Sequence, residues 1–375
     1  MSTSNYKTDA LKAKDKLTEV SPSMCLAKWN QTSLHLPTGL TNSCYHPPLH
    51  KMDAEAVKLN PAALHNTAEK LNQRQQMLEG KQPEGCSYCW NMEKTGEMSD
   101  RHYRSGEPWA MQDFEDIRKN PIDEHWTPRY VEVNFNNACN LKCSYCSPQF
   151  STTWGKEIDR YGQYPTSPPH NAPEHFQGRR RPIPNREENP YVDAFWKWWP
   201  TLYKNLKHFR MTGGEPMMDK NTYKVFQYII DHPKQDLHLN VTSNMCPADK
   251  KLKEKYFNMA SEICMQEKVE HMMQFVSVDA FGKRAEYIRN GLDFNYMMDN
   301  VEEFLDRIPV RNSITFICTY NNLSITSMDK LLEKILELRK KYSKTYQRVW
   351  FDVPLLRQPA WQQITLLPES YQGIH

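Results

Sequence analysis

The stretch that decides the fold is N-N-A-C-N-L-K-C-S-Y-C at residues 136–146, directly after the alternating segment Y-V-E-V-N-F at residues 130–135. Alternation of apolar and polar side chains predicts a strand, so Cys139, Cys143 and Cys146 follow a strand end. A [4Fe-4S] cluster has four irons and usually takes four cysteines. Three thiolates on one short loop can reach three of those irons and leave the fourth open, as catalytic metal sites keep an open position.

The same three cysteines allow two other interpretations. A zinc site could take three ligands here and a fourth from elsewhere in the chain, or the thiols could simply be buried. Ten cysteines in 375 residues would rarely fall this close together by chance. In a reducing compartment, clustered cysteines indicate metal binding or catalysis in preference to disulfides. We therefore expect a metal site in this loop.

Strand-like and helix-like segments alternate from Arg129 onward. Beyond residues 130–135, the apolar patterns predict strands at 208–212, 237–241, 274–278, 313–319 and 349–353, and helices at 221–231, 250–264, 295–308 and 328–342. About six β/α units in sequence favour a parallel sheet with helices outside, which can curl into a partial barrel. In such folds ligands bind at the carboxyl ends of the strands.

One stretch, residues 155–190, departs from this alternation. It contains Arg179–Arg181 and is rich in proline, at Pro165, Pro168, Pro169, Pro173, Pro182, Pro184 and Pro190. Such a composition predicts a long loop or lid and argues against a packed element.

The motif at residues 136–146 resembles the signature of the radical S-adenosylmethionine (SAM) superfamily. That signature is C-x3-C-x2-C at the end of the first barrel strand, with an aromatic residue before the last cysteine, here Tyr145. The resemblance implies an α/β fold with a partial (β/α)6 barrel and a [4Fe-4S] cluster on Cys139, Cys143 and Cys146, whose open iron binds SAM. It also implies reductive cleavage of SAM to a 5′-deoxyadenosyl radical that abstracts a substrate hydrogen atom.

A second motif, R-M-T-G-G-E-P-M-M-D at residues 210–219, follows the next expected strand. Glycines let backbone approach a ligand closely because they carry no Cβ. The motif is similar to the family's GGEP, which implies that Gly213, Gly214 and Glu215 contact the methionyl amino group of SAM. Taken alone, the segment could also be a strand-to-helix turn with Pro216 at a helix start.

Later strand ends supply the remaining cofactor candidates. Thr242, Ser243 and Asn244 are short polar residues suited to the ribose or the carboxylate of SAM, with an ordinary turn as the alternative. Arginine suits a carboxylate through two parallel N–H donors, and the resemblance implies that Arg289 plays this part. It implies further cofactor-binding roles for Tyr145, Ser277 and Asp279.

Four more cysteines, Cys25, Cys44, Cys86 and Cys89, lie in the first quarter of the chain. Their context resembles the auxiliary-cluster module called twitch, a shortened relative of the SPASM module, in which a hairpin and later cysteines hold a second [4Fe-4S] cluster. A helix-like segment at residues 53–79 would bridge the two pairs. In many relatives the module follows the barrel, whereas here it precedes it. A four-cysteine zinc site and free thiols are the alternatives, because spacing does not separate zinc from iron.

These motifs and the composition predict the organisation of the chain. A net charge of +3 does not point to nucleic acid or a membrane. No run of 18 apolar residues occurs and the N-terminus lacks the apolar core of a signal peptide, so we expect a cytoplasmic protein. The expected parts are a polar tail at 1–20, a twitch/SPASM-like module at 21–110, a partial barrel at 125–357 with an insertion at 155–190, and a C-terminal extension at 358–375.

The first functional hypothesis is a radical SAM enzyme that modifies a peptide, a protein or a small metabolite. It would need SAM, the SAM-binding [4Fe-4S] cluster, an auxiliary cluster or zinc ion, and a low-potential electron donor such as flavodoxin or ferredoxin. The residue that gives or takes the hydrogen atom is not assigned. The alternatives are a nucleic-acid-modifying enzyme on the same barrel, supported by Arg179–Arg181, and a non-catalytic iron–sulfur or zinc protein.

Overall fold

The computed structural model describes residues 3–167, 170–172 and 178–371 and divides into two compact units. The first unit comprises residues 1–133 and 186–209, and the second comprises residues 134–185 and 210–375. The division falls inside two strands, β4 (Tyr130–Asn134) and β6 (His208–Thr212). In the described part of the chain, no helix is long and apolar enough to cross a membrane.

The first unit contains a small sheet with the strand order β4-β1-β2-β3. The strands β1 (Gln31–His35) and β2 (Leu40–Asn42) form an antiparallel hairpin. Gly39 in its turn has a φ of 62°, a conformation that favours glycine. The other elements are β3 (His50–Lys51), α1 (Thr3–Thr18), α2 (Ala27–Asn30), α3 (Ala54–Leu59), η1 (Pro61–Leu64), α4 (Ala68–Leu78), η2 (Glu84–Cys86), α5 (Ser87–Lys94), α6 (Asp100–Gly106), α7 (Pro108–Met111), α8 (Phe114–Lys119) and α10 (Pro190–Asn205).

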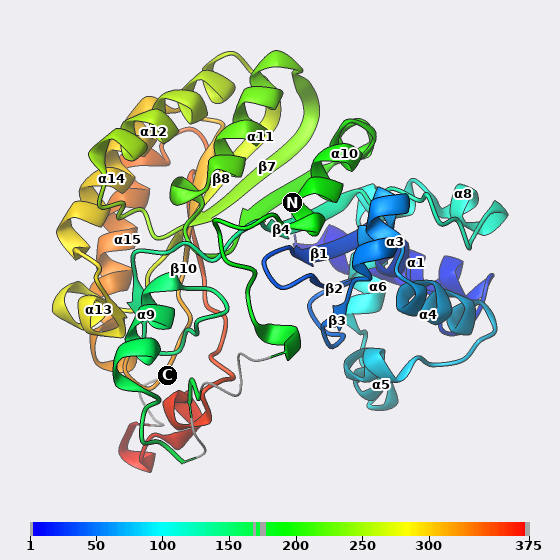
Figure 1. Ribbon diagram of the computed structural model, residues 1–375, viewed down its shortest axis with the longest axis horizontal. Coiled ribbons are helices and arrows are strands. Elements are labelled where there is room, and N and C mark those ends of the chain that lie inside the picture. Colours follow the sequence, from blue (N-terminus) through cyan, green and yellow to red (C-terminus); the bar gives the residue numbers. More distant parts are fainter. Residues whose placement is uncertain (1–2, 168–169, 173–177, 372–375) are drawn as a thin grey trace. The chain divides into compact units, whose positions relative to one another are not determined.

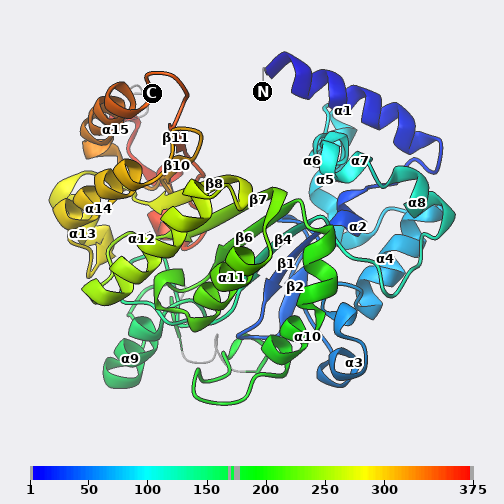
Figure 2. The same ribbon diagram turned by 90° about the horizontal axis from the view of Figure 1, so that it is seen from above.

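The described part of the expected polar tail is the helix α1. Helix α1 packs against α6, as Figure 2 shows. Ala10, Ala13 and Leu17 are buried, and their spacing of three and four residues places them on one face of a helix. The stripe is too narrow and its residues too small to stand out against the lysines around it.

The helix-like segment at residues 53–79 is three elements, because α3, η1 and α4 divide it. Pro61 begins η1, where a missing N–H costs no hydrogen bond. The side chain of Asn60 accepts a hydrogen bond from the Ala62 amide at 3.1 Å, and the Thr67 side chain caps α4. The two local caps therefore divide one apolar pattern into short helices.

The second unit is built on strands in the order β6-β7-β8-β10-β11. The pairs β7–β8, β8–β10 and β10–β11 are parallel, as the repeated β/α pattern predicts. The elements are β5 (Lys142–Cys143), α9 (Thr152–Tyr161), η4 (Gly178–Arg180), η5 (Pro216–Met218), α11 (Lys220–Asp231), β7 (Lys234–Ser243), α12 (Lys250–Met265), β8 (Val269–Ser277), α13 (Gly282–Ile288), β9 (Arg289–Asn290), α14 (Phe294–Arg307), β10 (Ser313–Ile317), η6 (Ile325–Ser327), α15 (Met328–Tyr342), β11 (Val349–Asp352), η7 (Ala360–Gln362), η8 (Ile364–Leu366) and η9 (Glu369–Tyr371).

The helices α11, α12, α14 and α15 lie along the outer side of these strands (Figure 1). Along β7, Leu237, Leu239 and Val241 are buried, whereas the residues between them are partly exposed. Successive side chains of a strand point to opposite faces. One face of the strands therefore forms the core with the helices, and the other face carries the more polar side chains.

The expected long loop at residues 155–190 begins as a helix, so that part of the prediction is wrong. Helix α9 reaches Tyr161 and buries Trp154 and Ile158. The Ser151 side chain caps its start, and Gly162, with a φ of 77°, follows its end. The prolines at 168, 169 and 173 lie outside the described residues.

A partly buried histidine in β8, His271, makes stability depend on pH. Burial, with smaller contributions from His238 and Arg311, lowers the pKa of His271 to about 4, against about 6.5 in an unfolded chain. Below pH 6.5 the unfolded chain therefore binds the proton more readily, and stability falls as the pH drops from about 6.5 toward 4. At pH 5 the loss reaches up to about 2 kcal/mol.

Replacing this ring tests that expectation. His271→Gln keeps a polar group near the Ser313 hydroxyl, which lies 3.0 Å from Nε2, but does not titrate. Urea denaturation at pH 7.5 and pH 5 should show a smaller loss in the variant than in the parent protein. Equal losses in both proteins would show that His271 does not cause the pH dependence.

Candidate cluster and cofactor site

The loop with Cys139, Cys143 and Cys146 is held by a short antiparallel pair of strands. In the pair β5–β9, Cys143 lies opposite Arg289. The Ser144 amide donates to the Ile288 carbonyl at 2.7 Å. The indole N–H of Trp154 donates to the Cys143 carbonyl at 2.8 Å. The Trp154 side chain of α9, the last carbonyl of α13 and the pairing with β9 thus fix the middle cysteine.

The protein alone does not stabilise these three thiols as thiolates. Burial, followed by repulsion from Cys143, raises the pKa of Cys146 to about 12. Burial, with Glu215 and the other two cysteines, raises the pKa of Cys139. Burial also raises the pKa of Cys143, and the Arg289 cation opposes that rise. Metal binding releases the protons of such thiols to solvent and neutralises the repulsion between the thiolates, so this group of cysteines fits a metal-ligand set.

The glycines of G-G-E-P lie directly against the backbone that leads to Cys139. A Cβ on Gly214 would meet the Ala138 carbonyl oxygen at 2.2 Å, and one on Gly213, whose φ is 119°, would meet Asn134 Oδ1 at 2.2 Å. The Glu215 amide donates to the Ala138 carbonyl at 2.6 Å. Because these glycines have no Cβ, the backbone of G-G-E-P can pack closely against the loop that carries Cys139.

The buried carboxylate of Glu215 accepts three hydrogen bonds from the chain. Oε1 accepts from the Met217 amide at 3.1 Å and from the Ser243 hydroxyl at 2.7 Å, and Oε2 accepts from the Asn244 amide at 2.8 Å. Burial raises the pKa of Glu215, and these three bonds lower it again in part. A carboxylate has about four acceptor positions, so about one position on Oε2 is left for a further donor.

The three polar residues at the end of β7 have different partners. Thr242 Oγ1 accepts from Nε and Nη2 of Arg210 at 3.2 and 3.1 Å. Ser243 contacts Glu215, as described above. The Asn244 side-chain amide donates to Asn140 Oδ1 at 3.0 Å, and Asn140 in turn donates to the Cys246 carbonyl at 2.8 Å. Asn244 therefore ties the end of β7 to the cluster loop.

Tyr145, Asp279 and Arg289 contact one another. The Tyr145 hydroxyl donates to Asp279 Oδ2 at 2.8 Å and accepts from Arg289 Nη2 at 2.7 Å. Arg289 Nη2 also donates to Asp279 Oδ1 at 3.0 Å, and Nε lies 2.8 Å from Oδ2. Ser277, the last residue of β8, is partly exposed.

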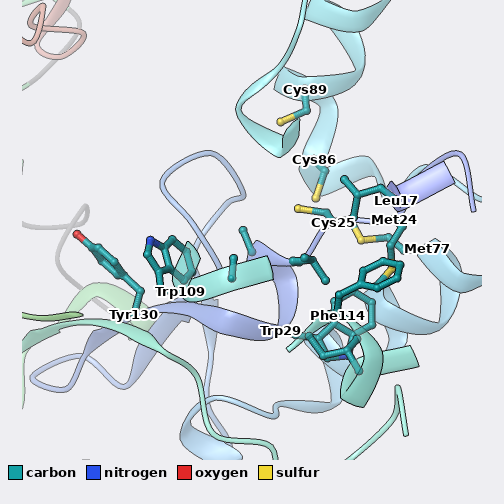
Figure 3. Packing of buried hydrophobic residues seen from close by; sticks show 14 of the residues in the cluster. Leu17, Met24, Cys25, Trp29, Met77, Cys86, Cys89, Trp109, Phe114 and Tyr130 are labelled. Atoms are coloured by element: carbon teal, nitrogen blue, oxygen red, sulfur yellow. The ribbon is translucent and has the colours of Figure 1, made fainter. Parts of the chain in front are cut away.

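The four N-terminal cysteines line one cavity in the first unit. Cys25, Cys44, Cys86 and Cys89 share this cavity with Lys28, Arg101 and Arg104. Figure 3 shows Cys86 and Cys89 beside Cys25 at the edge of an apolar cluster. Burial, and then repulsion among the four thiols, raises the pKa of Cys25 to about 12, and burial raises that of Cys89 to about 11.

A buried polar atom in the same cavity lacks a partner. Ser43 is 2% exposed and its hydroxyl has no hydrogen-bond partner. Such a group costs free energy unless something occupies the cavity. The cavity is also lined by the Asp100 carboxylate, so three cations face one anion there. Four thiols, a net positive lining and an unpartnered hydroxyl fit an anionic metal–sulfur group. No three His, Cys, Asp or Glu side chains among the described residues form a ready ligand set for a single ion.

The three remaining cysteines, Cys246, Cys264 and Cys318, are buried, as expected of small core residues. Sequence reasoning missed several partners of the cluster loop. Asn140 ties the loop to β7, and Gln362 donates from the C-terminal extension to the Ser144 hydroxyl at 2.8 Å. The only signal was the high content of asparagine around Cys139, which turns also explain.

The chain is similar to known proteins over part of its length. No protein-family model matches the chain. A stretch of 115 residues, 31% of the chain, is 23% identical to a GTP 3′,8-cyclase of Aliarcobacter butzleri (strain RM4018). The chain spans about a quarter of that relative, because the match covers 27% of its length.

Two solved structures illustrate the structural likeness. Native anSMEcpe with bound AdoMet has a TM-score of 0.36 and 13% identity, over 59% of this chain and 49% of that one. Streptococcus suis SuiB bound to S-adenosylmethionine has a TM-score of 0.39 and 14% identity, over 82% of this chain and 67% of that one.

Proposed function

We propose that this chain is a radical SAM enzyme with a partial (β/α)6 barrel, in which Cys139, Cys143 and Cys146 hold a [4Fe-4S] cluster. The observation that carries the proposal is the convergence of three motifs on one loop. The backbone of Gly214 and Glu215 packs on the residues before Cys139, and Arg289 pairs with Cys143 across β5–β9. The similarity of part of the chain to a GTP 3′,8-cyclase agrees with an enzymatic role.

When bound, the cluster and SAM would together supply a carbon-centred radical that abstracts a hydrogen atom. The chain's own residues position and shield these groups. Glu215 would accept a hydrogen bond from the SAM ammonium group at the remaining position on Oε2. Ser243 and Asn244 hold the Glu215 carboxylate in place. Thr242, Ser277 and Tyr145 would line the cofactor. Following the family, we propose a peptide or small-metabolite substrate and a low-potential donor such as flavodoxin or ferredoxin.

We further propose that Cys25, Cys44, Cys86 and Cys89 form a twitch-like module that holds an auxiliary [4Fe-4S] cluster, with zinc as the alternative. The shared cavity, the cations beside it and the unpartnered Ser43 hydroxyl support this assignment. Four cysteines would ligate all four irons of one cluster. No iron would then be open for substrate, so transfer of an electron is the role that fits.

Metal content tests the two sites together. Anaerobically reconstituted protein is expected to hold about eight irons per chain with matching sulfide. About four irons with one zinc would keep the SAM cluster and make the N-terminal site structural. Zinc without iron would contradict the radical SAM proposal.

Cys86→Ala should remove only the auxiliary cluster. We expect about four irons per chain, with cleavage of SAM to 5′-deoxyadenosine retained but no longer coupled to a product. Iron, sulfide and 5′-deoxyadenosine are measured in the same sample. Cys246→Ala, which removes another buried thiol, is the control and should keep about eight irons. Full iron retention in Cys86→Ala would show that Cys86 is not a ligand.

A further inference from the structure

The Arg289 guanidinium has few free N–H donors with which to bind a cofactor carboxylate. Its Nη2 donates both to Asp279 and to the Tyr145 hydroxyl, and its Nε faces Asp279. Its Nη1 lies 3.7 Å from Cys143 Sγ. Arginine has five N–H donors, of which Nη2 uses two and Nη1 directs one at Cys143. The two that remain, one on Nη1 and the one on Nε, which makes no hydrogen bond, are not adjacent. A bidentate bond to the SAM carboxylate needs two adjacent donors.

The charged groups of this network are buried next to a cluster ligand. Arg289 is 7% exposed and Asp279 is 0% exposed. Asp279 also accepts a hydrogen bond from the Thr319 amide at 2.9 Å. Pairing of β5 with β9 fixes Arg289 opposite Cys143. Buried charges are screened weakly by solvent and salt, so each acts strongly on its neighbours.

We propose that Arg289 and Asp279 form a positioned charge pair that sets the reduction potential of the cluster at Cys143, and that Arg289 does not hold the SAM carboxylate. This inference rests on the proposed function. Reduction adds one electron, taken from an external one-electron reductant, and so adds one negative charge to the cluster. The Arg289 cation favours the reduced state and raises the potential, whereas the Asp279 carboxylate opposes it. Tyr145 orients both partners.

Two neutralising variants should move the potential in opposite directions. Arg289→Gln leaves the Asp279 charge and should lower the potential, whereas Asp279→Asn leaves the Arg289 charge and should raise it. We expect at least a tenfold change in the reduction equilibrium in each case, which is about 59 mV for one electron. The measurement is a redox titration of the reconstituted protein without SAM, followed by electron paramagnetic resonance.

Controls separate charge from structure. Arg289→Lys keeps the charge and should restore most of the potential that Arg289→Gln loses. Arg307→Gln breaks an ion pair of 3.0 Å with Glu254, between α14 and α12, and should leave the potential unchanged. SAM affinity, measured by equilibrium binding to the oxidised protein, should change less than threefold in Arg289→Lys.

The outcomes distinguish this inference from the proposed function. Absence of any cluster in the parent protein would contradict the proposed function itself. A cluster whose potential stays constant in Arg289→Gln, with SAM affinity lost, would overturn the inference and return Arg289 to the SAM carboxylate. If a lone buried charge prevents folding, the double variant Asp279→Asn/Arg289→Gln carries the test. Arg289 Nη1 lies 3.7 Å from Cys143 Sγ, whereas the Asp279 carboxylate accepts from Arg289, Tyr145 and Thr319. The double variant should therefore show a lowered potential, and an unchanged or raised one would overturn the inference.

Discussion

Cys143→Ala should abolish cleavage of SAM and remove the cluster from the barrel site, leaving about four irons per chain on the auxiliary site. Cys143 is the middle ligand of the loop, and two thiols cannot hold a cubane in a catalytic arrangement. Alanine keeps the backbone pairing with Arg289, so the fold should survive. Iron and sulfide analysis with detection of 5′-deoxyadenosine measures both effects.

A matched control uses another buried thiol of the same unit. Cys264 is 2% exposed on α12, where its sulfur lies 3.7 Å from the Met272 sulfur. Cys264→Ala removes a sulfur of equal size and should cost some stability while keeping the iron and the activity. If Cys143→Ala retained the full iron content, the assignment of the barrel cluster would be wrong.

Gly214→Ala should have the second largest effect. The new Cβ would lie 2.2 Å from the Ala138 carbonyl oxygen and 2.7 Å from its carbon. Both are backbone atoms, so the segment that carries Cys139 must shift. We expect a loss on the order of 2–4 kcal/mol in the free energy of unfolding, and SAM binding weakened by at least tenfold. Denaturation and equilibrium binding measure the two quantities.

Gly155→Ala is the control for this substitution. Gly155 lies within α9, and no atom is near enough to obstruct a Cβ there. Alanine is favoured over glycine in a helix interior by up to about 1 kcal/mol, so this variant should be as stable as the parent protein or more so. Equal behaviour of the two alanine variants would show that the close packing at Gly214 is not needed.

The strands and helices of the second unit could be predicted because their patterns are strong. The predicted helix at 328–342 matches α15, and the predicted strand at 208–212 matches β6. Amphipathic helices bury every third or fourth residue, and strands alternate. These patterns persist because one face of each element packs in the core.

The sequence did not predict elements with a narrow apolar stripe. It also did not predict a helix at the start of a proline-rich stretch. Helix α1 buries two alanines and a leucine among lysines, and α9 begins where the proline-rich stretch begins. The breaks between α3, η1 and α4 depend on local caps that the apolar pattern does not show. In each case packing or capping determines where a helix forms or ends, and the composition does not.

The candidate site could likewise be predicted only in part. The cysteine loop and G-G-E-P are recognisable because each motif is continuous in sequence. The partners of their residues are not, since Ser243 meets Glu215 across 28 residues and Arg289 meets Cys143 across 146 residues. The ion pair between Arg289 and Asp279 in particular depends on the fold, and it gives Arg289 a partner that the family pattern does not imply.

The most direct test of the central proposal is cleavage of SAM by the anaerobically reconstituted, dithionite-reduced protein, with 5′-deoxyadenosine and methionine separated by chromatography. The proposal predicts both products in equal amounts from the parent protein and neither from Cys143→Ala. A parent protein that carries its full iron content, is reduced and still forms no 5′-deoxyadenosine would contradict it.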